Sequence, residues 1–175
     1  LSVRNPAQRL ILELCARLAD HRVDTLPLGV DGCGIPVYAI PLRSAALSFA
    51  RLASLEGVEP RDAQALAQVR FAMMSCPEYV GGTGEFDTVF MRAAKGDVTV
   101  KSGAEGVHGA AVINRETGLV LKVVDGNARA VAPAALHLLR RLDVLDDAVL
   151  REMEPFEHPV VYNRAGRAVG KISPR

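Results

Sequence analysis

Hydrophobic positions in the first half of the chain recur with a helical period. The clearest case follows Asn5 and Pro6, a pair that favours a helix start, and predicts a helix over residues 6–20. The same spacing predicts three more helices, at residues 42–55, 61–75 and about 86–94. In the helix over 61–75, the positions expected to face the core are Ala65, Leu66, Val69, Ala72 and Met73.

Extended segments are interspersed with these helices and dominate the second half. Short apolar runs at 26–30 and 37–40 flank a tight turn at 31–34. Three Val-rich runs then predict strands at residues 97–101, 106–114 and 119–125, the last two joined by a hairpin loop. Two helices and a pair of short strands are expected to follow, at residues 129–142, 146–152 and within 159–172.

This order of elements predicts an α+β fold, an antiparallel sheet flanked by helices. We expect residues 1–175 to form a single domain or the C-terminal part of a larger domain, with a helical part at 5–95 and a sheet with C-terminal helices at 96–175.

Composition narrows the class of protein. Of 175 residues, 49% are apolar and the net charge is only +1, which excludes a disordered chain. Nothing approaches the ~18 uninterrupted apolar residues of a membrane span. The absence of a basic stripe and of Trp argues against a nucleic-acid partner. Three cysteines, an odd number, favour a reducing compartment, so we expect a cytoplasmic protein with Cys15 and Cys76 in its core.

Two local motifs could carry chemistry. Asp31 and Cys33 lie on the glycine-rich turn, where the thiol is either a metal or pocket residue or simply a buried cysteine. Lys101 precedes Ser102 and Gly103, as in the Lys-Ser/Thr-Gly strand of penicillin-recognising serine enzymes, although the same residues suit a strand corner with a solvated lysine.

Other candidates are weaker. The loop of glycines at 81–84 opens a helix, whose free N–H groups attract anions, but a structural turn is the favoured interpretation. The histidines show no metal-binding spacing, and without a G-x-S-x-G motif a Ser/His/Asp triad is not supported. These histidines are His21, His108, His137 and His158.

Taken together, four segments closely resemble the bacterial L-asparaginase II family of the Rhizobium etli type. The resemblance runs from about residue 5 to residue 145. Its segments are Gly29–Pro36, Val80–Gly82 with Phe86–Thr88, Val100–Val107 and Leu121–Asn127.

The resemblance implies a fold similar to serine β-lactamases and penicillin-binding proteins. It implies hydrolysis of the side-chain amide of L-asparagine, using two Ser–Lys pairs beside a zinc ion held by two cysteines and a lysine. Lys101 matches the lysine of the second pair, Cys33 matches one zinc-binding cysteine, and Asp31 is an acidic neighbour with a catalytic role. Gly103 and Glu105 are the expected substrate-binding residues. The carboxylate of Asp31 or Glu105 would accept hydrogen bonds from the α-ammonium group of the substrate.

One departure from the family pattern is important. None of the seven serines is followed by lysine at the third position, so the Ser-x-x-Lys nucleophile is missing from this sequence. We therefore expect the C-terminal part of such an enzyme, with zinc held weakly if at all because the other ligands are missing. The alternatives are a catalytically inactive ligand-binding or assembly protein of the same descent and a domain of another serine amidase or peptidase.

Two spatial expectations follow. The Lys101 ammonium and the Cys33 sulfur should converge on a shared cavity. Strand edges left without neighbours could be covered in a homodimer.

Overall fold

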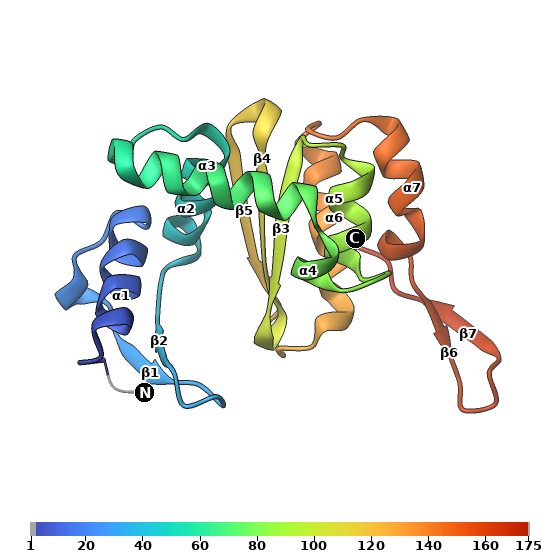
Figure 1. Cartoon of the computed structure of the whole chain (residues 1–175). Helices are drawn as coiled ribbons and strands as arrows, with labels where there is room; N and C mark the ends of the chain where they lie inside the picture. Colours follow the sequence, from blue (N-terminus) through green and yellow to red (C-terminus); the bar gives the residue numbers. More distant parts are fainter. Residues whose placement is uncertain (1–2, 175) are drawn as a thin grey trace.

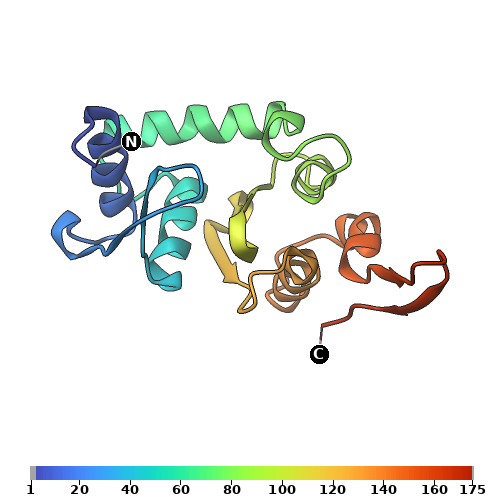
Figure 2. The same ribbon diagram turned by 90° about the horizontal axis from the view of Figure 1, so that it is seen from below.

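A three-stranded antiparallel sheet lies at the centre of the molecule, with helices against both of its faces (Figures 1 and 2). The computed structural model describes residues 3–174. Neighbouring strands follow the chain order β3 (Val98–Gly103), β4 (Val107–Val112) and β5 (Thr117–Lys122). Two short 3-10 turns join them, η2 (Ala104–Gly106) and η3 (Ile113–Arg115). The sheet thus leaves β3 and β5 as its two edges.

The main hydrophobic core lies between one face of this sheet and two helices, α5 (Phe86–Ala93) and α6 (Val131–Arg141). Alternate strand residues point to this face, as a period of two requires. From the helices, Phe90, Leu136 and Leu139 meet them and are fully buried. The strand residues of this core are Val98, Val100, Ala110, Val112, Leu119 and Leu121. A turn, η4 (Ala128–Ala130), precedes α6, and α7 (Asp147–Glu157) packs against α5 and α6.

The opposite face of the sheet carries helix α2 (Leu42–Ser54) in backbone contact. A Cβ atom placed on Gly118 of β5 would lie 2.0 Å from the carbonyl oxygen of Ala46 and 2.3 Å from the backbone nitrogen of Ala50. On β4, the ring of Phe49 occupies the space where Gly109 has no side chain. These glycines let the helix lie directly on the strands, since any larger residue would clash with it.

The N-terminal elements form a smaller unit beside α2 (Figure 1). Helix α1 (Pro6–Leu18) begins as expected, because the side chain of Asn5 accepts a hydrogen bond from the backbone N–H of Ala7 at 2.9 Å. A 3-10 turn, η1 (Val23–Thr25), leads to the hairpin of β1 (Leu28–Val30) and β2 (Pro36–Tyr38). The small hydrophobic core of this N-terminal unit consists of Leu12, Ala16 and Leu26.

Helix α3 (Pro60–Ser75) differs from the sequence-based expectation. It runs across the molecule from the end of α2 toward α4 (Glu78–Gly81), as Figure 2 shows, and none of its described residues is buried. Of the positions expected in the core, Ala65, Val69 and Ala72 are exposed, so the predicted buried stripe is wrong. The apolar contacts of this helix with two hydrophobic core clusters come from partly buried Leu66 and Met73. Cys76, expected in the core, is exposed at the end of this helix.

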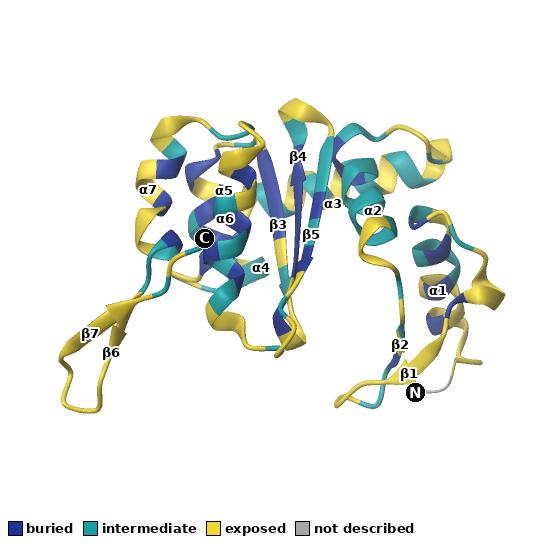
Figure 3. Cartoon of the chain, turned by 180° about the vertical axis from the view of Figure 1, so that it is seen from behind, coloured by how far each residue is buried: buried dark blue, intermediate teal, exposed yellow. Residues whose placement is uncertain are grey.

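The last two strands form a hairpin that projects from the molecule (Figures 1 and 3). Every residue of β6 (Val160–Tyr162) and β7 (Ala168–Lys171) is exposed. The hairpin pairs as an antiparallel ladder with one irregularity, at Val161 and Tyr162.

The prediction of an α+β fold with an antiparallel sheet is confirmed. Within residues 3–174, no helix combines the length and the apolar character that crossing a membrane requires.

Candidate functional site

Lys101 lies near the end of β3, on the face of the sheet that α2 covers farther along. It pairs across the ladder with Gly109, and paired residues of an antiparallel ladder point to the same face. The lysine is exposed, and its Nζ donates a hydrogen bond to the carbonyl oxygen of Ser102 at 2.6 Å. The end of the edge strand is therefore open around the predicted catalytic lysine.

Ser102 points to the other face of the sheet, where it meets the carboxylate of Asp87. The backbone N–H of Ser102 donates to Asp87 Oδ2 at 2.6 Å, and its hydroxyl donates to Oδ1 at 2.8 Å. His108 lies opposite Ser102 on β4, and its Nε2 is 3.2 Å from the same Oδ1. Asp87 thus links two neighbouring strands. Asp87 is only 3% exposed, and His108 is fully buried.

The electrostatics of this cluster favour an ionised Asp87. Burial raises the pKa of its carboxyl, but the hydrogen bonds from His108 and Ser102 outweigh burial and hold the pKa below its usual value. A carboxylate only accepts hydrogen bonds, so Nε2 of His108 is the donor in this contact. Among the residues that the structure describes, Nδ1 of His108 has no hydrogen-bond partner, and the ring packs 5.3 Å from that of Phe86.

This arrangement of Ser, His and Asp is not that of a nucleophile triad. In a triad the histidine accepts the proton of the serine, and the aspartate holds the other side of the ring. Here the Ser102 hydroxyl donates to the aspartate, which also takes the hydrogen bond from the histidine. Asp87 and His108 were not predicted as site residues.

The local sequence explains how Asp87 reaches the sheet. It lies in the first turn of α5, where a carboxylate is stabilised by the free N–H groups of the helix. The next residue, Thr88, donates from its hydroxyl to the carbonyl oxygen of Pro77 at 3.0 Å. A Cβ atom on Gly81 would lie 2.9 Å from Asp87 Cβ and from Thr88 Oγ1. The glycine-rich loop is thus a close-packed turn that fixes the start of α5.

A small hollow opens beside this cluster. Its volume is about 110 Å³, and Glu85, Asp87, Lys101 and Ser102 supply its polar lining. Val80, Gly81 and Phe86 complete the wall. The hollow therefore places one cation beside two carboxylates at the outer edge of β3.

Gly103 and Glu105, the predicted substrate-binding residues, follow at the turn between β3 and β4, and both are exposed. Gly103 has extended backbone, whereas Glu105 has φ 57°, a left-handed conformation. Lys122 of β5 holds this turn, because its Nζ donates to the carbonyl oxygens of Glu105 and Val123, each at 2.6 Å. The absent side chain of Gly126 leaves space for the Glu105 carboxylate, whose Oε2 lies 2.6 Å from the position of a Cβ there.

Asp31 and Cys33 lie on the turn between β1 and β2. Oδ1 of Asp31 accepts hydrogen bonds from the backbone N–H groups of Cys33 and Ile35, each at 2.9 Å, which makes the aspartate a turn-forming residue. Cys33 is exposed, so the alternative of a buried cysteine is wrong. This turn and the turn between β3 and β4 lie at the same end of the molecule (Figures 1 and 3), while convergence of Cys33 and Lys101 on one cavity stays a prediction.

The residues present do not by themselves fit the zinc site that the family resemblance implies. Oδ1 of Asp31, near Cys33, already accepts two backbone hydrogen bonds within the turn. A structural zinc ion takes four protein ligands and a catalytic one three. Within residues 3–174, no group of three or more His, Cys, Asp or Glu side chains is placed to hold a metal ion.

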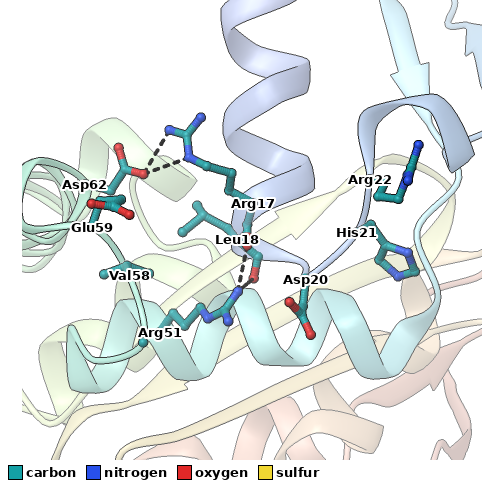
Figure 4. A pocket seen from close by; sticks show the side chains of 10 residues that line it. Arg17, Leu18, Asp20, His21, Arg22, Arg51, Val58, Glu59 and Asp62 are labelled. Atoms are coloured by element: carbon teal, nitrogen blue, oxygen red, sulfur yellow. Dashed lines mark hydrogen bonds and ion pairs between the residues drawn. The ribbon is translucent and has the colours of Figure 1, made fainter.

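A larger hollow of about 610 Å³ lies among α1, α2 and α3 (Figure 4). Two of its arginines make contacts that link the helices. Arg17 donates to Asp62 from Nε at 3.1 Å and from Nη2 at 2.8 Å. Arg51 donates to the carbonyl oxygens of Arg17 and Leu18 at 2.7 and 2.9 Å, and so caps the end of α1. Because these contacts link helices to one another, they have an evident structural role, and none of the predicted site residues lines this hollow.

The fold and the edge-strand cluster define an α+β protein with a polar site at one end of its sheet. A family model described as L-asparaginase II matches residues 1–174, and the chain belongs to that family. A search of curated proteins found no match. Family membership supports an asparaginase-like function, that of a hydrolase acting on a small molecule.

Proposed function

We propose that this chain carries part of an L-asparaginase active site, in which the side-chain amide of L-asparagine is hydrolysed to L-aspartate and ammonia. One observation carries the proposal. In a chain of the L-asparaginase II family, Lys101 lies at the open end of an edge strand and lines a polar hollow. Lys101 is the residue of this chain that would accept and donate protons during acyl transfer.

Lysine must be neutral to accept a proton from a serine hydroxyl. An ordinary lysine is almost wholly charged near neutral pH, and exclusion of water from the amine favours the neutral form. Lys101 is exposed in this chain. The proposal therefore requires a further surface, bearing the Ser-x-x-Lys nucleophile, that covers this end of the sheet during the reaction.

Glu105 is the better of the two proposed acceptors for the α-ammonium group of asparagine. Oδ1 of Asp31 already accepts two hydrogen bonds from its own turn. Glu105 follows Lys101 by four residues, and Lys122 holds its backbone at the strand end. The exposed backbone of Gly103 would line the substrate site between Lys101 and Glu105.

A catalytically inactive binding protein is the second candidate function. The observation that favours it is the lack of Ser-x-x-Lys in the printed sequence. Such a protein would bind asparagine at the same strand end and release no ammonia.

Ammonia release from L-asparagine tests these functions. The chain is assayed alone and together with a family segment that carries Ser-x-x-Lys, and Lys101→Ala is compared with Lys171→Ala on the exposed strand β7. We expect turnover only with the added segment, a loss of about 10²-fold or more in Lys101→Ala, and no loss in Lys171→Ala.

Three other results would change the assignment. Asparagine binding without turnover in every combination would favour the inactive binding protein. Turnover by the chain alone would contradict the inference that the nucleophile lies outside this sequence, and unchanged turnover in Lys101→Ala would remove the proposed role of that lysine.

A further inference from the structure

Asp87 supplies a hydrogen-bond acceptor where the sheet itself has none. β3 is an edge strand, and the outward N–H groups of an edge strand have no neighbouring strand to bond. Ser102 N–H reaches Asp87 Oδ2 at 2.6 Å. We propose that Asp87 is a positioning residue, which fixes the Lys101–Ser102 segment in the orientation that the proposed asparaginase reaction needs. The catalytic part of this inference rests on the proposed function.

The peptide bond transmits the restraint from Ser102 to Lys101. The nitrogen of Ser102 shares a rigid plane with the carbonyl group and Cα of Lys101. Fixing the direction of the Ser102 N–H therefore fixes that plane, which is one of the two peptide planes that meet at the Cα atom from which the lysine side chain leaves. Asp87 does not need to touch the substrate to have this effect.

Three donors from two strands make the restraint firm. Asp87 accepts from the N–H and hydroxyl of Ser102 on β3 and from Nε2 of His108 on β4. Asp87 is 3% exposed and His108 is fully buried, while Ser102 is half-buried. Hydrogen bonds to a charged group in such surroundings are stronger than neutral ones.

The carboxylate is itself held from the helix side. Thr88 donates to the carbonyl oxygen of Pro77 at 3.0 Å, and Arg92 of α5 forms an ion pair with Glu78 of α4. Gly81 lets the end of α4 approach Asp87 closely. The position of Lys101 is thus tied, through Asp87, to the packing of α4 against α5.

Amide hydrogen exchange of the full chain tests the restraint without any need for activity. In the wild-type protein, the outward N–H of Ser102 should be protected although it lies on an edge strand. Asp87→Asn should raise its exchange rate about tenfold or more. Asp62→Asn is the matched control, because Asp62 is also a hydrogen-bonded aspartate but pairs with Arg17 away from β3.

The catalytic part is tested in the ammonia-release assay with the added Ser-x-x-Lys segment. Misplacing a catalytic group by about 1 Å can cost roughly 10²-fold, so Asp87→Asn should lower kcat about 10- to 100-fold with little change in KM. Asp87→Glu, which keeps the charge, should restore part of the rate. Asp62→Asn should leave kcat unchanged.

Several outcomes would overturn the inference. In the wild-type protein, exchange of the Ser102 N–H as fast as that of an exposed loop would contradict the restraint, and this result does not depend on whether Asp87→Asn folds. Equal exchange rates of the Ser102 N–H in Asp87→Asn and Asp62→Asn would also contradict it. A folded Asp87→Asn protein with unchanged kcat would remove the catalytic part. If no form of the protein releases ammonia, the proposed function fails, while the exchange measurements still decide whether Asp87 holds the strand.

Discussion

Arg140 of α6 and Glu157 of α7 form a two-point ion pair at the edge of the main core. Nε and Nη2 of the arginine donate to the two carboxylate oxygens at 3.2 and 2.5 Å. The glutamate side chain is only 5% exposed, whereas the arginine side chain is 47% exposed. The pair therefore neutralises a buried charge with a cation that stays in contact with water.

The first prediction concerns this pair. Glu157→Gln keeps the shape of the side chain but removes its charge and one acceptor, so the free energy of unfolding should fall by about 1–3 kcal/mol. Glu152→Gln, at an exposed position of the same helix, should change it by less than about 0.5 kcal/mol. Urea unfolding of both variants checks this, and equal stability of the two would contradict it.

The second prediction concerns the contact between α2 and β5. Gly118→Ala would place a Cβ atom 2.0 Å from the carbonyl oxygen of Ala46, so helix and strand must separate. We expect a loss of about 3 kcal/mol or more, at the upper end of what overpacking costs. Gly170→Ala, on a strand where nothing lies within 4 Å of the added atom, is the control. Thermal unfolding should show a large drop in Tm for the first variant alone.

The third prediction is the contribution of Asp87 to acid stability. Its pKa is lower in the folded protein than the value of about 3.9 expected when unfolded, because hydrogen bonds from His108 and Ser102 outweigh burial. The carboxylate thus stabilises the folded state above that unfolded value, and this contribution is lost as the pH falls through the folded pKa.

Unfolding curves at several pH values between 7 and 3 test this contribution. Asp87→Asn should be less stable than the wild-type protein at pH 7, and the difference should shrink below about pH 4. Asp24→Asn removes an exposed carboxylate whose pKa is lowered by a hydrogen bond from Arg22, and it should have little effect at any pH. A difference that is constant with pH would contradict the assignment.

The fourth prediction concerns zinc. Cys33 is exposed, and among residues 3–174 no suitable cluster of metal ligands surrounds it. A purified, tag-free chain should therefore contain much less than one zinc ion per molecule, and a chelator should leave its Tm unchanged. Metal analysis of the wild-type protein and of Cys33→Ser checks this. Stoichiometric zinc that is lost in Cys33→Ser would show that the chain forms the site by itself.

Local signals in the sequence were enough to place most elements. Asn5 with Pro6 marks the start of α1 because the cap and the missing N–H both suit the first helical turn. Val-rich runs identified all three strands of the central sheet. Helix α7 is longer than expected, since Pro155 lies in its last turn and the chain stays helical as far as Glu157, which binds Arg140.

Features that depend on tertiary packing could not be predicted in the same way. An apolar pattern on α3 shows that a helix forms but not how much of it the rest of the chain covers. The joining of Asp87, Ser102 and His108 depends on the register of β3 and β4, which pairs Ser102 with His108. The first strand was expected to end at residue 101 and the second to begin at residue 106. With these bounds Ser102 lies outside the first strand, so its pairing with His108 could not be predicted. A lone histidine among small apolar strand residues was the available signal.

Direct contact between α2 and the strands has a consequence for the whole molecule. At Gly118 no side chain lies between helix and sheet, so the two backbones touch directly. The β1–β2 hairpin leads into α2 through Ala39–Pro41, so its end is joined directly to the helix that packs on the strands. Two residues without side chains, Gly109 and Gly118, thus set how closely α2, and the hairpin joined to it, can approach the sheet that carries Lys101.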